Sequence, residues 1–432
     1  MAKKVFMSCS SDILHYGHIR IFEKAAELGE LTVGVLTDHV VAQYKRIPLV
    51  PFQERINLIK SLSCVTNVVE QDELSYKKII EQLKPDVIVH GDDWVTGKQA
   101  SLREEVMNLV SSYGGQVIEF PYTNDININV LEGRFAERYT VPEIRRGMLK
   151  KLLKLKKPLS VLEAHNGLTG LIVENTQVNV DGGIKQFDAM WVSSLCDSSS
   201  RGKPDIELVD ISKRIERINE IMEVTTKPII LDGDTGGLAE HFVYTVQTLE
   251  RLGVSAIIIE DKIGLKMNSL FGTEVEQTQD TIENFSEKIK KGKQALRTND
   301  FMIIARIESL ILGQGIEDAL KRAIAYVEAG ADGIMIHSKE KSPDEVYEFS
   351  EKFKLRFPNV CLVAVPTTYN TETEAALAAH GFDIVIHANH LLRSAFPAME
   401  KVAQKILLHG STKCVEEDCM PIKDVISFIP LK

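Results

Sequence analysis

The chain of 432 residues contains no long apolar run and only six cysteines, which are scattered along it. The N-terminus MAKKVFMSCS lacks the apolar region of a signal peptide, and no stretch approaches the roughly 20 apolar residues of a membrane span. Scattered cysteines are typical of proteins in a reducing compartment. We therefore expect a cytoplasmic protein that has no membrane partner.

Basic residues form no extended block that stands out, and the formal net charge is −10. Since nucleic-acid-binding proteins usually carry a basic patch, we do not expect a nucleic acid as a partner. Cys414 and Cys419 lie close together, but no further Cys or His pair accompanies them. We interpret them as surface thiols rather than zinc ligands.

The C-terminal part of the chain contains eight short apolar runs, each of which ends on a polar or charged residue. The runs are too short and too rich in β-branched residues for helices, and polar or helix-like stretches follow them. Strands that alternate with helices predict a parallel sheet, and eight such units predict a closed (β/α)8 barrel. The runs are LSVLEAHN, DAMWVSS, PIILDGD, SAIIIED, FMIIARIE, DGIMIHS, NVCLVAVPTT and FDIVIHAN.

Three carboxylates stand at the ends of two consecutive predicted strands. Asp232 and Asp234 flank a glycine after PIIL, and Glu260 ends the next strand. The C-terminal ends of barrel strands build the active site, and hard oxygen ligands suit Mg²⁺. We predict that these three residues form a magnesium site; the alternative is a turn with solvated acids.

Further polar residues after these carboxylates suggest an anionic substrate. The segment EDKIGLKMNSLFGTEVEQ has lysines, an asparagine and a serine without a helical period, which predicts a mobile lid carrying anion-binding donors. An ordinary long surface loop is the alternative. Arg306 and His337 end later strands, and both can donate to phosphate or carboxylate oxygens.

Residues 1–130 alternate strands and helices in the order typical of a doubly wound α/β domain. His15-Tyr16-Gly17-His18 opens a predicted helix directly after the first strand. A helix N-terminus attracts phosphate, and imidazole groups add donors. Taken alone, the two histidines could also be a zinc pair or two satisfied polar residues. The predicted strands are KKVFMSC, ELTVGVLTD, NVVE, DVIVHGDD and QVIEF.

Four motifs of this first domain together resemble the cytidylyltransferases of the nucleotidyltransferase superfamily. They are DILHYGHIRIFEKA, VGVLTD, the helix with Gln53-Glu54-Arg55, and HGDDW, and the resemblance covers most of residues 1–125. It implies that the domain uses CTP and that His15 and His18 bind the triphosphate, with Lys45 as a further phosphate contact. The nucleotide site implied in this way also includes Asp12, Asp92 and Asp93.

The first domain departs from this family at two places. Cys9-Ser10-Ser11-Asp12 replaces a Gly-Thr-Phe-Asp loop, so a side chain stands where glycine would let the backbone approach phosphate. Thr123-Asn124-Asp125-Ile126-Asn127 replaces an arginine-containing signature. Two interpretations stay open: a transferase with a different acceptor, or a nucleotide-sensing or assembly domain without catalysis.

The second part of the chain resembles the phosphoenolpyruvate mutases of the isocitrate lyase superfamily. The motifs are WVSSL, SSSRGKPD, LDGDTGG, IEDK-x3-K-x-NSL, ARIES and HS, within a barrel that we assign to residues 158–432. The lyase branch carries a Lys-Lys-Cys-Gly-His motif, whereas this chain has Glu260-Asp261-Lys262-Ile263-Gly264 and no lid cysteine. This counts against C–C cleavage, but a phosphonopyruvate hydrolase shares the layout and remains an alternative.

The resemblance implies Mg²⁺-dependent interconversion of phosphoenolpyruvate and phosphonopyruvate, with Asp232 touching the metal directly and Asp234 and Glu260 through water. Arg306, His337 and Asn268 would hold the phosphoryl group, and Asp205 and Lys266 would support the lid and the site. The substrate-binding residues would be Trp191, Ser193, Leu195, Ser269 and Leu270.

The resemblances also suggest how the two parts of the chain could work together. The fused first domain could use CTP to activate a later phosphonate. We predict a homo-oligomer, a dimer or a tetramer. Residues 131–157 are charged and helical, and we interpret them as a solvated helical linker, with contact to a neighbouring subunit as the alternative.

Overall fold

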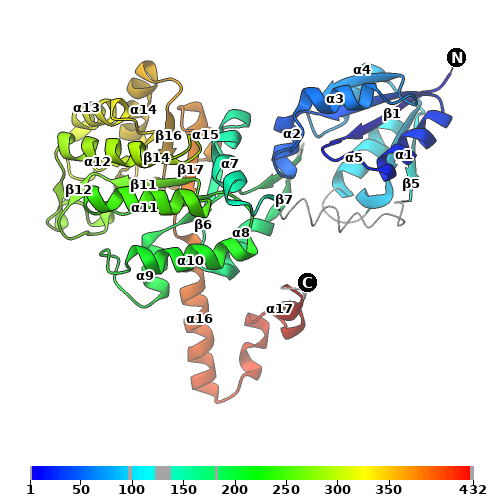
Figure 1. Ribbon diagram of the computed structural model, residues 1–432. Helices are drawn as coiled ribbons and strands as arrows, with labels where there is room; N and C mark the ends of the chain where they lie inside the picture. The colour runs from blue at the N-terminus through cyan, green and yellow to red at the C-terminus, as the bar shows by residue number, and fades with distance from the viewer. Residues whose placement is uncertain (1, 96–99, 122–137, 181–182, 429–432) are drawn as a thin grey trace.

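The computed structural model describes residues 2–95, 100–121, 138–180 and 183–428. Two α/β domains lie side by side, and a helical arm at the C-terminal end projects from the second domain (Figure 1).

The N-terminal domain is a five-stranded parallel sheet with the strand order β3-β2-β1-β4-β5. Helices cover both faces: α1 (Tyr16–Glu27) and α3 (Phe52–Lys60) pack on one, α4 (Lys77–Leu83) and α5 (Ala100–Ser111) on the other. The doubly wound prediction is confirmed. The strands are β1 (Lys4–Cys9), β2 (Glu30–Leu36), β3 (Asn67–Gln71), β4 (Val87–Gly91) and β5 (Gln116–Phe120).

The second domain is a closed parallel barrel with the strand order β10-β11-β14-β15-β16-β17-β6-β9. The eight predicted apolar runs are these eight strands, so the barrel prediction is confirmed. Their bounds are β6 (Leu159–Glu163), β9 (Ala189–Val192), β10 (Ile229–Asp232), β11 (Ala256–Glu260), β14 (Met302–Ile307), β15 (Gly333–Ile336), β16 (Cys361–Ala364) and β17 (Ile384–His387).

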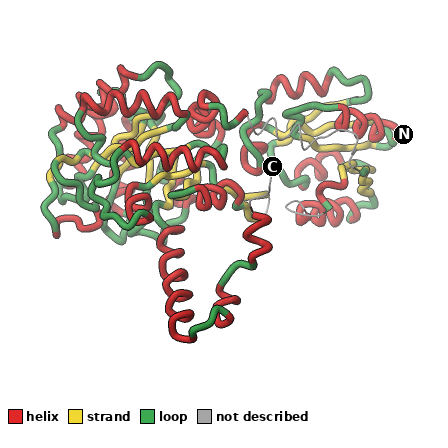
Figure 2. The backbone as a smooth tube through the Cα atoms, turned by 60° about the horizontal axis from the view of Figure 1, so that its bottom comes forward, coloured by secondary structure: helices red, strands yellow, loops and turns green. Residues whose placement is uncertain are grey.

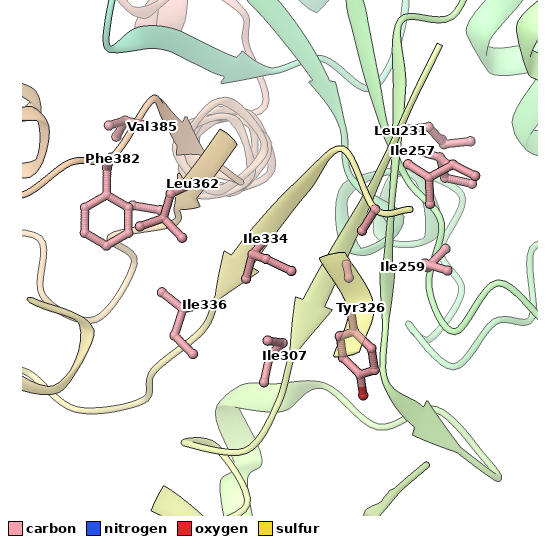
Figure 3. Packing of buried hydrophobic residues seen from close by; sticks show 14 of the residues in the cluster. Leu231, Ile257, Ile259, Ile307, Tyr326, Ile334, Ile336, Leu362, Phe382 and Val385 are labelled. Carbon is pink, nitrogen blue, oxygen red and sulfur yellow. The ribbon is translucent and has the colours of Figure 1, made fainter. Parts of the chain in front are cut away.

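The strands are largely apolar up to their carboxyl ends because both of their faces are buried. Leu231 and Ile257, from neighbouring strands, belong to the outer layer that the helices cover (Figure 3). Ile230 and Ile258 point the other way, into the barrel. The surrounding helices are α8 (Gly167–Asn175), α9 (Ser194–Ser200), α10 (Ile211–Val224), α11 (Ala239–Leu252), α12 (Ile282–Ala295), α13 (Gly315–Glu328), α14 (Asp344–Arg356) and α15 (Glu374–Ala379).

Helix α7 (Pro142–Leu155) closes the N-terminal end of the barrel. Its Leu149 and Leu152 are buried in the same cluster as the inward residues of the strands. Arg145 and Arg146 are buried too, and Arg146 donates to the Glu250 carbonyl at 2.9 Å. The interpretation of this segment as solvated is therefore wrong for Arg145 and Arg146, which donate to buried carbonyls, whereas Lys151 and Lys154 are exposed as expected. The buried leucines fill the N-terminal end of the barrel.

The two domains meet at this closed end of the barrel. Helix α2 (Asp38–Tyr44), which the sequence analysis missed, packs against α7 and against a hairpin of β7 (Gln177–Val180) and β8 (Gly183–Gln186). Arg46 pairs with Glu174 at 2.8 Å, and Gln186 donates to the Lys45 carbonyl at 2.7 Å. A cavity of about 170 Å³ at this joint is lined by charged groups that are already paired, including Arg46 and Glu174.

The C-terminal arm consists of α16 (His390–His409), η3 (Lys413–Asp418) and α17 (Ile422–Phe428). Helix α16 leaves the barrel and the chain then turns back, so the arm stands away from the barrel in both views (Figures 1 and 2). No residue of α16 is buried. Among the described residues, no helix combines the length and the apolar character needed to cross a membrane.

Candidate functional site

The alternation of the barrel strands aims the predicted site residues inward. Ile230, Ile258 and Ile304 face the barrel interior, so the residues two positions later in each strand share that direction. These are Asp232, Glu260 and Arg306, each at or near the carboxyl end of its strand. The fold therefore gathers them at one mouth of the barrel, as the sequence analysis expected.

Asp232 is held by the start of α9. Its Oδ2 accepts hydrogen bonds from the Ser194 backbone N–H at 3.1 Å and from the Ser194 hydroxyl at 2.8 Å. Burial acts to raise the pKa of Asp232, but Lys266 and Arg214 outweigh it and lower the pKa below its usual value. Asp232 is thus a preorganised anion. Ser194 holds its Oδ2, and its Oδ1 takes no part in that contact.

Asp234 is held by two cations. Arg214 on α10 donates to its Oδ2 at 2.8 Å, and Lys266 from the lid contacts its Oδ1. Lys266 also donates to the Ser194 hydroxyl at 2.6 Å and to Asp205 Oδ1 at 2.9 Å. Burial acts to lower the pKa of Lys266, yet the surrounding carboxylates, Asp234 foremost, raise it. The lysine is therefore a permanent positive charge at the centre of the site.

A second ionic group lies beside the first, around Arg306. The Nη2 of Arg306 donates to the Ser269 hydroxyl at 2.7 Å and lies 3.4 Å from Glu260 Oε2. Its Nε bonds Glu308 Oε1 at 2.5 Å. Because Glu308 is fully buried, this pair fixes the guanidinium plane at the barrel mouth.

His337 completes this group. Its Nδ1 lies 2.9 Å from Arg306 NH2, and burial followed by the charge of Arg306 lowers the pKa of the ring. Nδ1 also lies 3.3 Å from Glu308 Oε1, but Arg306 can only donate, so a neutral ring that accepts from it at Nδ1 carries its proton on Nε2. Nε2–H is then a donor, which suits an anionic ligand.

The predicted lid lies over the site and is only partly irregular. The predicted segment, residues 260–277, contains β12 (Lys262–Ile263) and η2 (Ser269–Glu274), and β13 (Thr278–Gln279) follows it directly. Because β12 pairs with β13, the lid of the structure is the segment 262–279. Lys266 and Ser269 are buried in the site, and Asn268 Nδ2 lies 3.3 Å from Asp205 Oδ2. Leu270 is 46% exposed, so the structure does not bring it into the site in this arrangement.

The predicted contacts of the second strand lie at the edge of the site. Trp191 packs inside the barrel, and the Ser193 hydroxyl caps α9 by accepting from the Cys196 N–H at 3.3 Å. Leu195 is half-buried in the first turn of the same helix. Ser194, between them, makes the direct contacts with Asp232 and Lys266.

The carboxylates of the mouth are paired with cations. Within the described ranges, no three His, Cys, Asp or Glu side chains lie close enough together to hold one ion, and Lys266 contacts Asp234. Glu260 is buried, and its Oε1 forms an ion pair with Lys262 Nζ at 3.1 Å but accepts no aligned hydrogen bond there. Burial raises the pKa of Glu260 to about 7. Buried oxygens of Asp232 and Glu260 that face one mouth fit a hard cation such as Mg²⁺.

The N-terminal domain brings its two predicted histidines together. His15 precedes α1 and His18 lies in its first turn, and their ring centroids are 3.9 Å apart. Asp12 Oδ1 accepts from the backbone N–H groups of Leu49 and Val50 at 2.7 and 2.9 Å. Asp12 thus fixes the loop that follows α2.

The other predicted nucleotide residues are more dispersed. Lys45 ends α2, at the joint with the barrel, and its Nζ lies over the Tyr44 ring. Asp92 and Asp93 form the turn η1 (Asp92–Trp94) after β4; the Asp93 side chain lies outside the described part of the chain. Residues 123–127, where the arginine signature is missing, are also outside the described residues.

Cys9 ends β1, and its expected effect on the phosphate loop stays a prediction. Its side chain is buried in the core of the domain, and this burial raises the pKa of the thiol to about 12. The loop turns at Ser11, whose φ of 45° lies in the left-handed region. Arg55, fully buried, holds the surrounding loops by donating to the Val50 carbonyl at 3.0 Å and the Leu36 carbonyl at 2.8 Å.

Family comparisons agree with this architecture. The family model described as phosphoenolpyruvate phosphomutase matches residues 149–407, and a cytidylyltransferase-like model matches residues 10–144. The chain belongs to the phosphoenolpyruvate phosphomutase family. It also carries an N-terminal cytidylyltransferase-like domain.

Two curated relatives of this family differ in the reaction that their names give. A phosphoenolpyruvate phosphomutase of Tetrahymena pyriformis is 36% identical over 64% of this chain and 88% of its own length. A phosphonopyruvate hydrolase of Variovorax sp. is also 36% identical, over 64% of this chain and 92% of its own length. Overall identity therefore does not separate a mutase from a hydrolase.

Solved structures show the same pair. The phosphoenolpyruvate phosphomutase of Streptomyces platensis subsp. rosaceus has a TM-score of 0.59 and 34% identity, covering 65% of this chain and 93% of its own. A phosphonopyruvate hydrolase in complex with oxalate and Mg²⁺ has a TM-score of 0.58 and 34% identity, covering 66% and 94%. Both comparisons concern the barrel and leave the N-terminal domain aside.

Several residues of the site were not assigned a role from the sequence. Ser194 and Glu308 stand in the quoted motifs WVSSL and ARIES, so their place at strand ends was a usable signal. Lys262, which lies 3.1 Å from Glu260 Oε1, follows Glu260 closely in the chain. Arg214 lies on a helix far from any strand end, and only the fold brings it to Asp234.

Proposed function

We propose that the barrel interconverts phosphoenolpyruvate and phosphonopyruvate. The observation that carries this proposal is the lid: Lys266 and Ser269 are buried between the two ionic groups, where Lys266 contacts Asp205 and Asp234 and Ser269 contacts Arg306. A closed lid of this kind keeps water from a phosphoryl group in transit.

In this reaction, the P–O bond to the enol oxygen breaks and a P–C bond forms at the methylene carbon. No atom is lost, because the same phosphoryl group moves within one substrate. A loose phosphoryl transfer requires positioning and charge stabilisation rather than a protein nucleophile. Arg306 and His337 would bind the phosphoryl oxygens, and Asn268 would stabilise them as the bond to oxygen is lost.

Magnesium would be held by Asp232, with Asp234 and Glu260 through water. When bound, the ion would stabilise the charge of the enolate oxygen. Ser194 would keep Asp232 oriented, and Arg214 would keep Asp234 oriented, since both donors already hold these carboxylates. The backbone near Trp191, Ser193 and Leu195 would lie against the substrate carboxylate.

The second candidate is phosphonopyruvate hydrolysis, since the chain is as similar to a hydrolase as to a mutase. Phosphorus NMR of the protein with phosphonopyruvate and Mg²⁺ separates the two. A mutase gives phosphoenolpyruvate, and a hydrolase gives phosphate together with pyruvate. Phosphate as the main product would replace the proposal.

For the N-terminal domain, we propose CTP binding at His15 and His18, followed by nucleotide transfer to a phosphonate. The match to cytidylyltransferase-like domains and the paired histidines at the start of α1 support this. The domain contacts the closed end of the barrel, opposite the barrel mouth. A product of the barrel would therefore cross solvent before reaching the nucleotide site. Adding CTP and candidate phosphonates to the NMR sample tests the transfer.

We also propose that the protein is a homo-oligomer, as the sequence analysis expected. Helix α16 has no buried residue, yet it presents Phe396, Met399, Leu407 and Leu408, which are 65%, 62%, 87% and 78% exposed. A second copy of the chain could cover these side chains. Light scattering of the wild type and of a Leu407→Ser, Leu408→Ser variant tests this: a monomeric wild type would remove the proposal.

A further inference from the structure

Asp261 is a buried carboxylate beside the site that faces away from it. It follows Glu260 directly, so its side chain points to the opposite side of the chain from the barrel mouth. It is 0% exposed. A buried charge of this kind is expensive unless hydrogen bonds and counter-charges surround it, so its partners indicate what it is for.

Four donors converge on this carboxylate. Oδ1 accepts from the Glu308 N–H at 2.9 Å. Oδ2 accepts from Gln279 Nε2 at 3.0 Å, from the Tyr326 hydroxyl at 2.8 Å and from Arg322 NH1 at 3.2 Å. Arg322 and Tyr326 lie four residues apart on α13 and so share one face of that helix.

These contacts join the two ends of the lid. Asp261 immediately precedes the lid, and the Asp280 N–H donates to the Asp261 carbonyl at 2.8 Å as the lid ends. Arg322 NH1 also donates to the Asp280 carbonyl at 2.8 Å. Strands β12 and β13 pair between these points, with Lys262 opposite Gln279. The beginning and the end of the lid are therefore fixed at one place.

Further hydrogen bonds connect the two ends of the lid to α13. Gln279 Nε2 donates to the Ser309 hydroxyl at 3.0 Å, and Ser309 donates to Asp318 Oδ2 at 2.7 Å. Arg322 Nε donates to the same Asp318 oxygen at 2.8 Å. The lid ends, the loop after β14 and helix α13 thus form one polar network behind the site.

We propose that Arg322 and Tyr326 are positioning residues for the lid, acting through Asp261. Fixing both ends of segment 262–279 at one point reduces the conformations open to it, so closure delivers Lys266, Asn268 and Ser269 to the site in one geometry. The effect of Arg322 and Tyr326 on the reaction products rests on the proposed function of the barrel. Their effect on the conformation of the lid does not.

The first test measures the lid without any substrate. Tyr326→Phe removes one hydrogen bond to Asp261 and keeps the buried ring. Amide hydrogen exchange over 262–279 should become about tenfold faster, which is the scale expected for losing a hydrogen bond to a charged group. Tyr347→Phe is the control, because its hydroxyl donates to Glu372 at 2.5 Å, a partner outside the hydrogen bonds around Asp261.

Arg322→Lys is the second variant, in case Tyr326→Phe does not fold; it keeps the charge but loses the forked contact with Asp261 and Asp318. Unchanged lid exchange in a folded variant of either kind would overturn the proposal. The same holds if Tyr347→Phe accelerates lid exchange equally, because the effect would then reflect general loosening of the barrel.

The second test follows products by phosphorus NMR with phosphonopyruvate and Mg²⁺. A looser lid should lower kcat more than it raises KM and should increase the share of phosphate relative to phosphoenolpyruvate. An unchanged product ratio with a faster-exchanging lid would overturn the role in excluding water. If the wild type makes no phosphoenolpyruvate at all, the proposed function fails. The exchange measurement still decides whether Arg322 and Tyr326 position the lid.

Discussion

The barrel and the N-terminal domain position their candidate sites in different ways. In the barrel, charged side chains at strand ends are buried and paired with one another, as Arg306 is with Glu308 and Lys266 with Asp234. In the N-terminal domain, the histidines lie at a helix start, and Asp12 and Arg55 hold the loops around them through several backbone groups, with one ion pair between Arg55 and Asp38 at 2.5 Å. The barrel site depends on side-chain charge, whereas the N-terminal site depends on loop conformation.

The largest expected effect tests the charge dependence of the barrel. Asp232→Ala should lower kcat/KM for phosphonopyruvate by at least about 10³, more than the loss of one hydrogen-bond donor, because it removes the proposed direct metal contact. Steady-state kinetics at saturating Mg²⁺ measures this, with circular dichroism to establish that the variant is folded.

Asp300→Ala is the matched control, since this carboxylate lies at the closed end of the barrel beside Arg146. Wild-type activity in a folded Asp232→Ala protein would remove the metal assignment.

The next effect concerns the lid. Asn268→Ala should lower kcat by about 10² to 10³ with little change in KM, because the amide donor matters most when the phosphoryl group is least bonded. Phe271→Ala, an exposed position in the same lid, should be nearly silent. Equal, small effects of both substitutions would place Asn268 outside the reaction.

A smaller effect is expected in the N-terminal domain. His18→Ala should weaken CTP binding by about tenfold, the loss of roughly one hydrogen bond to a charged group. Calorimetry with CTP, ATP and GTP measures this, with Lys60→Ala at the exposed end of α3 as the control. If the wild type binds none of these nucleotides, the domain is a structural module. The two domains would then differ in function as well as in how their sites are held.

The last effect is on stability rather than on activity or binding, and it lies at the joint between the domains. Burial lowers the pKa of Lys227 from 10.5 to about 8. Between these two values the unfolded chain binds more protons than the folded protein, so this group makes stability rise as pH increases from about 8 to 10.5. The melting temperature of the wild type relative to Lys227→Met should increase over that window. A constant difference between them would show that Lys227 is solvated.

Particular residues show how far the sequence could lead. The eight strands were predictable because each run is buried on both faces and is therefore mostly apolar up to its polar end. Asp232, Glu260, Arg306 and His337 were predictable from their place at strand ends, since a closed barrel gathers those ends at one mouth. Helix α2 and the hairpin of β7 and β8 were missed, because they are short and their stability comes from the contact between the two domains.

The amino-acid sequence by itself determined the fold class, the family and the order of the strand-end residues, because these depend on local patterns along the chain. Only the tertiary structure decided that Arg214 reaches Asp234 and that Arg322 and Tyr326 meet Asp261. It also decided that the basic residues Arg145 and Arg146 are buried. These residues lie on helices, where neighbouring positions face solvent and core in turn. Their partners lie far away in the chain, so the contacts form only once the helices pack.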